Sequence, residues 1–558
     1  MQRNQQQLHG CSLIAGVPAS PKAGVNEFTA VDPARGEPPA TVFFEAADDQ
    51  LEQAAEAAAE AQNLLSRTEP KTRAALLRAV AEGLEQLGDV LIERCMAETA
   101  LPEARLHNER ARTVKQLRMF ADLLEEGSWV DARIDRGLPN RTPAPKPDIR
   151  RLLLPIGPVA VFGASNFPLA FSVAGGDTAA ALAAGNPVIV KAHPSHPGTS
   201  ELVGEVICAA VAQLGLPGGV FSLLHGPGTH IGATLVRHPA IQAVAFTGSL
   251  RAGRALFDIA AARPEPIPVF AEMGSTNPVF VLPGALRTRG SEIGRGLAAA
   301  ATLGIGQFCT QPGVAFVPKA PERESWIEDC ARAITTQSCS AMLTQEIASA
   351  FEDATARIEA VPGVTRIAAD SPRDDSDTAQ GSKPPPGAVP PGGARAFRTD
   401  LKTYLSTPVL RSEAFGPCTI FVTVESGSEL LKAARSIGGQ LTATIHGEAA
   451  ELTEHHELCM ILARSVGRVV FNGFPTGVEV CPAMQHGGPY PATTSAQFTS
   501  VGTAAILRFV RPVCFQDMPQ DLLPAELRDE NPRGILRQVD GVHTRAAIEP
   551  DPIERPES

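Results

Sequence analysis

Hydrophobic and polar positions recur at helical spacing in the first part of the chain, and a pattern of alternating strands and helices follows it. As far as about residue 126 they recur at helical spacing: residues 48–66 and 70–98 are rich in alanine and leucine with charges between them, and Glu103–Glu126 continues this pattern up to Gly127. We therefore expect three helices in this part of the chain. A proline-rich connector, residues 143–147, is expected to lead into a short strand at Arg151–Leu154.

From residue 158, short apolar runs alternate with longer stretches of small residues, which is typical of strands and helices in turn. Strands connected in this way pair in parallel and are covered on both faces. The sequence therefore predicts an α/β fold whose ligands bind beyond the carboxyl ends of the strands, where the turns place polar residues. The expected strands are Val159–Phe162, Pro187–Lys191, Val220–Leu224 and Ala243–Phe246, and the expected helices are Ala170–Ala184, one that ends at Val211, and Thr229–Val236.

A second α/β unit is expected after Glu272, with its own helix from Glu292 to Thr302. Residues 370–394 are acidic and then rich in proline and glycine, which is typical of a mobile surface loop. Order is expected to return near Phe397. The segment from about Pro519 is charged and interrupted by prolines, and is interpreted as a surface tail.

The composition narrows the class of protein without identifying it. The chain has 558 residues, of which 44% are hydrophobic and 20% charged, and its net charge of −12 disfavours a nucleic-acid partner. Ten scattered cysteines without a CxxC pair indicate reduced thiols. The polar N-terminus predicts no signal peptide, and the apolar stretches are too often broken for a membrane span. A cytoplasmic protein with no membrane partner is therefore expected.

Two glycine-flanked motifs carry groups that can attack a carbonyl carbon and hydrolyse a thioester. Cys309 lies in Gly-Gln-Phe-Cys-Thr (306–310), and Glu272 lies in Phe-Ala-Glu-Met-Gly (270–274). A free thiol is only about a few per cent thiolate at pH 7, so the site must supply a base or a positive field. A buried inert cysteine is the commoner case, and the interpretation therefore depends on the neighbouring motifs.

Three turns that follow predicted strands are suited to a nucleotide. Lys191 projects from a strand end, the Thr-Gly-Ser turn 247–249 opens a helix whose N-terminus attracts phosphate, and Gly226 and Gly228 make a flexible turn. Each of these features alone has an equally good structural explanation: Lys191 can be a solvated lysine, and each turn can be an ordinary loop. Together they favour a nucleotide, although a standard dinucleotide-binding fold is not supported because no GxGxxG fingerprint occurs in the right place.

Two further loops offer polar groups. Asn166 lies in the turn Gly-Ala-Ser-Asn-Phe-Pro (163–168), where its amide can donate to an oxyanion, a contact worth about 3–4 kcal/mol in a transition state. The alternative is an asparagine that bonds its own turn, which is the more common role. Glu413 and Phe415 lie in Glu-Ala-Phe-Gly-Pro (413–417), a weak signal by itself.

Taken in order, these motifs resemble those of the aldehyde dehydrogenase superfamily over about residues 28–515. The resemblance implies a parallel-sheet nucleotide-binding domain, an α/β catalytic domain and a small β oligomerisation arm. It makes Cys309 the nucleophile, Glu272 the general base that later activates water, and Asn166 a donor to the oxyanion. It implies no metal. Cofactor contacts are implied for Ala164, Ser165, Lys191, His193, Gly228, Gly248, Ser249, Glu413 and Phe415.

The resemblance also bears on the choice of cofactor. Most of the superfamily carries a glutamate three residues after the strand-end lysine, where it bonds the adenosine ribose; here that position is Pro194. Without this carboxylate a 2′-phosphate meets no repulsion, and Lys191 with His193 can attract it. We expect NADP to be accepted, and preference for NADP and dual use with NAD are the two alternatives.

Residues 485–493 and 508–513 resemble one branch of the superfamily, which contains 2-oxoglutarate semialdehyde (2,5-dioxopentanoate) dehydrogenases and bacterial NADP-dependent fatty aldehyde dehydrogenases. Alignment with this branch places Arg112 in the substrate tunnel, where it can grip a distal carboxylate. The alternative for Arg112 is an ion pair on the helix surface. Phe167 and Phe474 are expected as apolar walls. The keto acid is the favoured substrate, and a medium- or long-chain aldehyde is the alternative.

Homodimers or homotetramers are expected, through arm strands at Arg151–Leu154 and Ile506–Val510. Two other classes stay open: a non-catalytic relative, which the intact Cys309, Glu272 and Asn166 disfavour, and a CoA-acylating enzyme, which Glu272 disfavours. The expected domains are 28–130 with 152–272 for NAD(P) binding, 273–484 for catalysis, 131–151 with 485–515 for the arm, and 516–558 as the tail.

Overall fold

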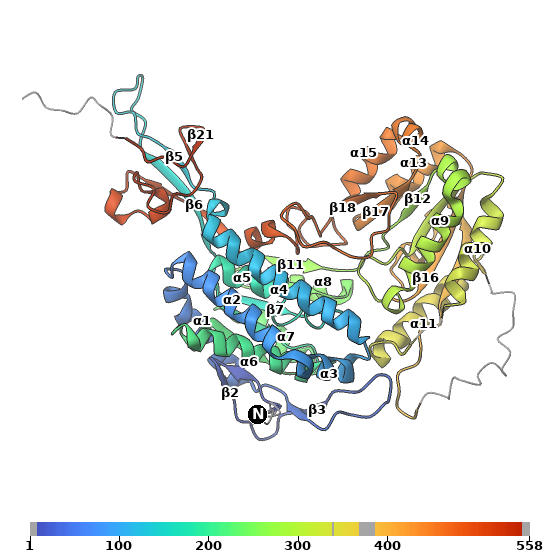
Figure 1. The fold of residues 1–558 in the computed structure, drawn as a ribbon, viewed down its shortest axis with the longest axis horizontal. Coiled ribbons are helices and arrows are strands. Elements are labelled where there is room, and N and C mark those ends of the chain that lie inside the picture. The colour runs from blue at the N-terminus through green and yellow to red at the C-terminus, as the bar shows by residue number, and fades with distance from the viewer. Residues whose placement is uncertain (1–7, 338–339, 368–384, 550–558) are drawn as a thin grey trace, which may run out of the picture.

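The computed structural model describes residues 8–337, 340–367 and 385–549 and has three sheets of five or more strands (Figure 1). Two of them are seven-stranded and helix-covered, and they lie side by side in the body of the molecule. The third, five-stranded sheet stands away from the first as an arm (Figure 1). A separate two-stranded ribbon pairs β3 (Glu27–Thr29) with β4 (Val42–Phe44).

The first sheet confirms the predicted parallel α/β arrangement. Five neighbouring strands, from β11 to β9, are parallel, and the short β1 pairs with β9 antiparallel. Alternate residues of one strand enter different cores: Val159 and Val161 pack with α2, α5 and α6, whereas Ala160 and Phe162 pack with α1, α7 and α8. The strand order is β11 (Val269–Glu272), β10 (Ala243–Thr247), β7 (Val159–Phe162), β8 (Val188–Lys191), β9 (Phe221–Leu224), β1 (Leu13–Ile14) and β2 (Val17–Pro18).

Most predicted helices of this part occur near their expected bounds, with two corrections. The stretch 70–98 forms two helices, because Gly88 takes a positive φ of 56° and breaks the chain direction. The helix expected from Ala170 begins only at Gly176, since residues 170–175 form turns. The helices are α1 (Asp48–Leu65), α2 (Pro70–Gln86), α3 (Gly88–Thr99), α4 (Glu103–Glu126), α5 (Gly176–Ala184), α6 (Pro197–Gln213), α7 (His230–Arg237) and α8 (Leu250–Ala261).

The second sheet is also largely parallel, with only the short edge strand β14 antiparallel. Its strand order is β14 (Thr365–Arg366), β15 (Arg395–Asp400), β16 (Cys418–Val424), β13 (Val314–Pro318), β12 (Val279–Val281), β17 (Gln440–His446) and β18 (Val466–Phe471). Its helices are α9 (Pro283–Thr302), α10 (Arg323–Thr335), α11 (Gln345–Glu359), α12 (Leu401–Ser406), α13 (Gly427–Ser436), α14 (Ala449–Glu454) and α15 (His456–Ser465).

Two expectations for the second unit can be compared with this sheet. The helix expected from Glu292 starts earlier, at Pro283, and is interrupted by a non-helical Arg289. The predicted loop 370–394 lies outside the described residues as far as residue 384, and its last ten residues lead directly into β15.

The arm corrects two predictions. Residues 503–509 form a 3₁₀ helix, so the second arm strand is not Ile506–Val510 but begins at Val510. The predicted tail is part of the sheet, because residues 537–539 and 542–544 add two strands and Leu527 and Ile535 are buried in the core of the arm. The order is β19 (Val510–Gln516), β6 (Ile149–Pro155), β5 (Arg133–Asp135), β20 (Arg537–Val539) and β21 (Val542–Thr544).

Among the helices of the described residues, none combines the length and the apolar character that crossing a membrane requires.

Replacing Leu527 by alanine should destabilise the arm by about 2–5 kcal/mol, because the side chain is 0% exposed in the core beneath β5 and β6. Leu522, five residues earlier, is 66% exposed, so Leu522→Ala is the matched control and should change stability by less than about 0.5 kcal/mol. Amide hydrogen exchange of residues 133–135 and 537–539 measures the difference. Equal protection in the two variants would contradict a structural role for this C-terminal segment.

Candidate active site

Cys309 follows a 3₁₀ turn, Leu303–Gly306, which places the thiol at the junction of the two large sheets. Gly306 has a φ of 63°, and a Cβ there would lie 2.3 Å from the backbone of Gly416, so only glycine allows this approach. The Asn277 amide donates hydrogen bonds to the carbonyls of Cys309, at 2.8 Å, and Gln311, at 2.9 Å. The turn that carries the thiol is therefore fixed by the second sheet.

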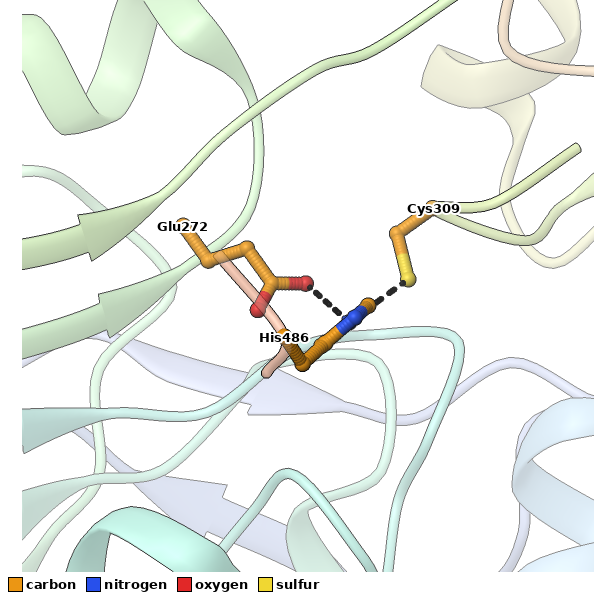
Figure 2. A group of neighbouring side chains, drawn as sticks. All are labelled: Glu272, Cys309 and His486. Atoms are coloured by element: carbon orange, nitrogen blue, oxygen red, sulfur yellow. Dashed lines mark hydrogen bonds and ion pairs between the residues drawn. The ribbon is translucent and has the colours of Figure 1, made fainter. Parts of the chain in front are cut away.

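Glu272 ends β11 and faces the same space as Cys309, with a histidine between them (Figure 2). His486 Nε2 lies 3.0 Å from Glu272 Oε1 and 3.6 Å from Cys309 Sγ. The hydroxyl of Ser500 donates to Glu272 Oε2 at 2.6 Å. The structure thus brings a thiol, an imidazole and a carboxylate together from three distant parts of the chain.

His486 reaches this position because residues 485–500 fold back along the first sheet. The N–H of Met273 donates to the Ala492 carbonyl at 2.8 Å, and that of Thr494 donates to Ala271 at 3.1 Å, so the returning chain adds to the edge of β11. Ser500 N–H donates to the His486 carbonyl at 2.8 Å. The histidine and the serine that contact Glu272 are therefore tied to each other.

Burial and charge set the protonation of these groups. Burial raises the pKa of the Cys309 thiol well above its usual range, and the Glu272 carboxylate raises it further, while Arg112 acts in the opposite direction. Burial alone would also raise the pKa of Glu272, but His486 and Ser500 hold it below its usual range. The resting site is therefore a neutral thiol beside an ionised carboxylate, with His486 in contact with both.

Asn166 is buried near Cys309, and its turn is fastened to α4. The Asn166 amide donates to the Gln307 carbonyl at 2.9 Å, two residues before Cys309. The Glu109 carboxylate accepts from the N–H groups of Leu169 and Ala170 at 2.8 and 2.9 Å. The second N–H of the Asn166 amide can still serve an oxyanion.

Arg112 lies one helical turn after Glu109, with its guanidinium 4.9 Å from the centre of the Phe171 ring. Both of its Nη atoms are buried and have no hydrogen-bond partner among the described residues. Burial lowers the pKa of Arg112, and the charges of Glu109, Cys309 and Glu272 act to restore it. The guanidinium is thus a buried cation within the field of the thiol site and free to bind an anion.

Phe167 and Phe474, the predicted apolar walls, have different surroundings. Phe167 packs edge-on against Phe308, the residue before Cys309, with ring centres 5.2 Å apart. Phe474 packs on His446, with ring centres 4.9 Å apart, and on Gly296 of α9. Its described contacts belong to the core of the second sheet, which does not support a role as a tunnel wall.

The predicted cofactor residues of the first sheet lie at the carboxyl ends of its strands. Lys191 ends β8, and Ser249 follows β10 and caps α8, where its hydroxyl accepts from Ala252 N–H at 3.3 Å. Gly248 stands beside it, with its N–H bonded to the Glu272 carbonyl at 3.0 Å. A lysine and an open helix N-terminus at one sheet edge fit a nucleotide with a pyrophosphate.

Three more predicted cofactor residues border the same edge. Gly228 is exposed, and a Cβ there would meet little beyond the Glu45 carboxylate. Ala164 and Ser165 precede Asn166, and the Ala164 carbonyl is bonded to His196 at 3.1 Å. These positions leave room for a ligand beside β7, β8 and β9.

His193 lies next to Lys191 but does not behave as the predicted second cation. Its ring stacks on His196, with centres 5.3 Å apart, and its Nδ1 accepts from Ser195 N–H at 3.2 Å. Burial, with His196 and Lys191 adding to it, lowers the pKa of His193 well below its usual range. It is therefore neutral at physiological pH, which leaves Lys191 as the positive group of this pair.

Glu413 approaches the thiol site from the second sheet and packs against Gly274, where a Cβ would lie 2.4 Å from its carboxylate. Burial raises the pKa of Glu413 to about 7, while the N–H of Ser275 lowers it. Phe415, two residues later, is half-buried beside Gly416, the glycine that contacts Gly306. The loop that bears both residues therefore adjoins the turn of Cys309.

Sequence reasoning assigned no role to His486, Ser500 or Glu109. His486 stands 177 residues after Cys309, and only the tertiary fold brings the two together. The sequence offered one local signal for His486, its place before two glycines in residues 485–488. For Glu109 the signal was its spacing of three residues from Arg112 on the same helix face.

Comparison with protein-family models matches residues 20–342 to the aldehyde dehydrogenase family. The chain is 48% identical to alpha-ketoglutaric semialdehyde dehydrogenase 2 of Azospirillum brasilense, over 97% of this chain and 99% of that protein. It is 42% identical to alpha-ketoglutaric semialdehyde dehydrogenase of Acinetobacter baylyi, with the same coverage.

Solved structures share the fold at lower identity. Betaine aldehyde dehydrogenase of Staphylococcus aureus in complex with NAD⁺ superposes with a TM-score of 0.75 at 18% identity, over 92% of this chain and 99% of that chain. The NADP-dependent glyceraldehyde-3-phosphate dehydrogenase of Bacillus halodurans, complexed with NADP, gives 0.74 at 20% identity, over 91% and 99%.

Glu272→Gln should make Cys309 react faster with iodoacetamide at pH 7, because the carboxylate charge that raises the thiol pKa is removed. His486→Asn should slow the reaction, because the imidazole 3.6 Å from Sγ can no longer accept the thiol proton. Mass spectrometry of the Cys309 peptide measures both rates, with the exposed Cys514 as internal reference. Slower labelling in Glu272→Gln would contradict the electrostatic arrangement given above.

Proposed function

Because this chain belongs to the aldehyde dehydrogenase family, we propose that it oxidises 2-oxoglutarate semialdehyde (2,5-dioxopentanoate) to 2-oxoglutarate with a nicotinamide cofactor. The observation that carries the choice of substrate is Arg112, a buried cation whose two Nη atoms have no partner among the described residues. The two relatives reported above, both named for this substrate, support the same choice.

Arg112 suits the end of the substrate remote from the aldehyde. A 2-oxo acid carries a planar carboxylate beside a carbonyl oxygen, and a guanidinium binds such an oxygen pair through two parallel N–H groups. Leaving a buried guanidinium unpaired is costly, so a substrate carboxylate that pairs with it gains both charge and hydrogen bonds. The predicted alternative, an ion pair on the helix surface, fits poorly, since the charged head of Arg112 is buried.

The first step is attack on the aldehyde carbon by the sulfur of Cys309. His486 Nε2, 3.6 Å from Cys309 Sγ, is within reach of the thiol proton. The free N–H of the Asn166 amide and the backbone N–H of Cys309 bind the oxygen as it becomes negative. This gives a tetrahedral thiohemiacetal on Cys309.

A nicotinamide held at the carboxyl edge of the first sheet would supply the hydride acceptor, and loss of hydride from the thiohemiacetal carbon would leave a thioester on Cys309. Glu272 then takes a proton from water, which attacks the thioester and releases the acid. Glu272 is suited to act as this base, because its carboxylate is held ionised and lies in the same group of side chains as the Cys309 sulfur.

For the cofactor, the residues at the carboxyl edge of the first sheet support acceptance of NADP. Pro194 offers no carboxylate to repel a 2′-phosphate, and Lys191 is the cation at this edge. One carboxylate lies near Lys191, because the charge of Glu45 raises the pKa of the lysine. We expect NADP to be used, with NAD accepted as well.

A second candidate substrate, a medium- or long-chain aldehyde, is favoured by one observation. The rings of Phe167, Phe171 and Phe308 pack on each other beside the thiol site, with centres 5.2–5.4 Å apart. An alkyl chain would bury apolar surface there. Arg112 lies over one of these rings, however, and an alkyl chain would leave its buried charge unpaired.

We assign cofactor binding to the first sheet, catalysis to the second and self-association to the arm. A homodimer or homotetramer formed through the exposed edge of β19 is expected. Sedimentation of the purified protein would give the number of subunits.

Arg112→Ala should lower kcat/KM for 2-oxoglutarate semialdehyde by about 100-fold or more, because a buried charge pair with the substrate is lost. Activity on a medium-chain alkanal should change little, since that substrate has no carboxylate. Initial rates of NADPH and NADH formation measure both, with Cys309→Ala as the blank. Arg118→Ala is the matched control, because Arg118 lies on the same helix and pairs with Glu85 at the surface.

Two results would contradict this assignment. An equal loss on both substrates would indicate that Arg112 has a structural role. A preference of the wild type for the alkanal would indicate that fatty aldehydes are the substrates.

Affinity for NADPH should fall as the pH rises through about 8, because burial lowers the pKa of Lys191 to about 8 and the ammonium is neutral above that value. The limiting slope is about tenfold per pH unit for one proton. Titration followed by NADPH fluorescence measures the dissociation constant without turnover. Lys191→Arg, which stays charged, should give a flat profile, and a fall of the same size in that variant would exclude Lys191 as the cause.

A further inference from the structure

We propose that Glu272, Cys309 and His486 form a binding site for Zn²⁺ that reversibly inhibits the enzyme. Each residue offers one ligand atom, and the three atoms all lie within 4.8 Å of one another (Figure 2). The set combines a thiolate, an imidazole and a carboxylate, which are the three ligand types that zinc takes from proteins. Magnesium and calcium prefer sites made of oxygen alone.

The distances agree with zinc coordination. Zinc bonds of about 2.3 Å to sulfur and about 2.0 Å to nitrogen or oxygen, at tetrahedral angles, place sulfur and nitrogen about 3.5 Å apart and nitrogen and oxygen about 3.3 Å apart. The observed separations are 3.6 Å for Cys309 Sγ to His486 Nε2 and 3.0 Å for His486 Nε2 to Glu272 Oε1. These two separations differ from the expected ones by a few tenths of an ångström, and the third pair, the Cys309 sulfur and a Glu272 carboxylate oxygen, lies within 4.8 Å and closes around the ion as it binds.

The hydrogen bonding of the three groups also favours a cation between them. His486 Nε2 faces two atoms, the sulfur and a carboxylate oxygen, although a single nitrogen carries at most one proton. Glu272 Oε1 is buried and faces His486 Nε2 at 3.0 Å, and the Glu272 carboxylate also interacts with the Cys309 thiol. A divalent ion at the centre would bind all three atoms at once.

Binding must inhibit, because it occupies both the nucleophile and the general base. The ion displaces one proton, from the Cys309 thiol to solvent, and no oxidant or reductant is involved. The sequence predicts no metal for catalysis, and the proposed ion takes no part in the reaction. The site depends on the geometry of three side chains and not on which aldehyde is oxidised, so it is tested separately from the proposed function.

The test is a titration of the full-length protein with Co²⁺, which occupies zinc sites and gives a thiolate-to-metal absorption band. Wild type should bind one Co²⁺ with this band, and Zn²⁺ should displace it. The band should vanish in Cys309→Ser, and His486→Asn should weaken binding about tenfold or more. Cys514→Ser and His543→Asn, at exposed positions, are the matched controls and should bind as wild type does.

A second measurement does not depend on the variants being folded. In wild type, Zn²⁺ should protect Cys309 from iodoacetamide and stop turnover, and a chelator should restore both. A band that persists in Cys309→Ser, binding unchanged in His486→Asn, or inhibition without protection of Cys309 would each overturn the proposal.

Discussion

The pairing of residues 492–494 with β11 is the contact on which the site depends. It consists of the two backbone hydrogen bonds that join Met273 to Ala492 and Thr494 to Ala271. It holds His486 and Ser500 against Glu272, whereas Cys309 is held from the other side by Asn277 of the second sheet. The reacting groups thus come from two sheets, and this short stretch of backbone fixes the position of His486 and Ser500 relative to Glu272.

The site contains buried charged groups, Glu272 and Arg112, whose ionised forms are destabilised by the loss of water around them. Ionised Glu272 raises the pKa of the Cys309 thiol, and His486, Ser500 and the hydrogen bond from Cys309 together hold the pKa of the carboxylate below its usual range. Arg112 is the other buried charge, whose own environment supplies no hydrogen-bond partner to its Nη atoms in the described part of the chain. Such an arrangement is unfavourable at rest and improves as an anionic substrate binds, which adds to the affinity for the substrate.

The sequence predicted local structure where the hydrophobic period was clear. The strands at 159–162 and 243–247 and the helix Glu103–Glu126 lie within a residue or two of expectation, because buried parallel strands and amphipathic helices have strong periods. It failed at Gly88, where one glycine splits a helix. It also failed in the C-terminal segment, where charged and proline-rich surroundings hide Leu527 and Ile535, which the arm buries. The motifs located Cys309 and Glu272, but His486 could not be found, since nothing local distinguishes a histidine whose partner lies 177 residues away.

The helix α4 carries Arg105, Glu109 and Arg112 at spacings of four and three residues, so that all three lie on one face. Arg105 donates to the Asn166 carbonyl and lies 4.8 Å from the Phe308 ring, Glu109 anchors the turn of Asn166, and the guanidinium of Arg112 lies over the Phe171 ring. Because these three residues lie on one helix, a shift of α4 that moves one of them moves the others as well. Substitutions that move α4 to admit a longer or uncharged aldehyde would therefore also displace the turn of Asn166, the proposed oxyanion donor. Evolution along this line is therefore confined to exchanging side chains on a fixed backbone.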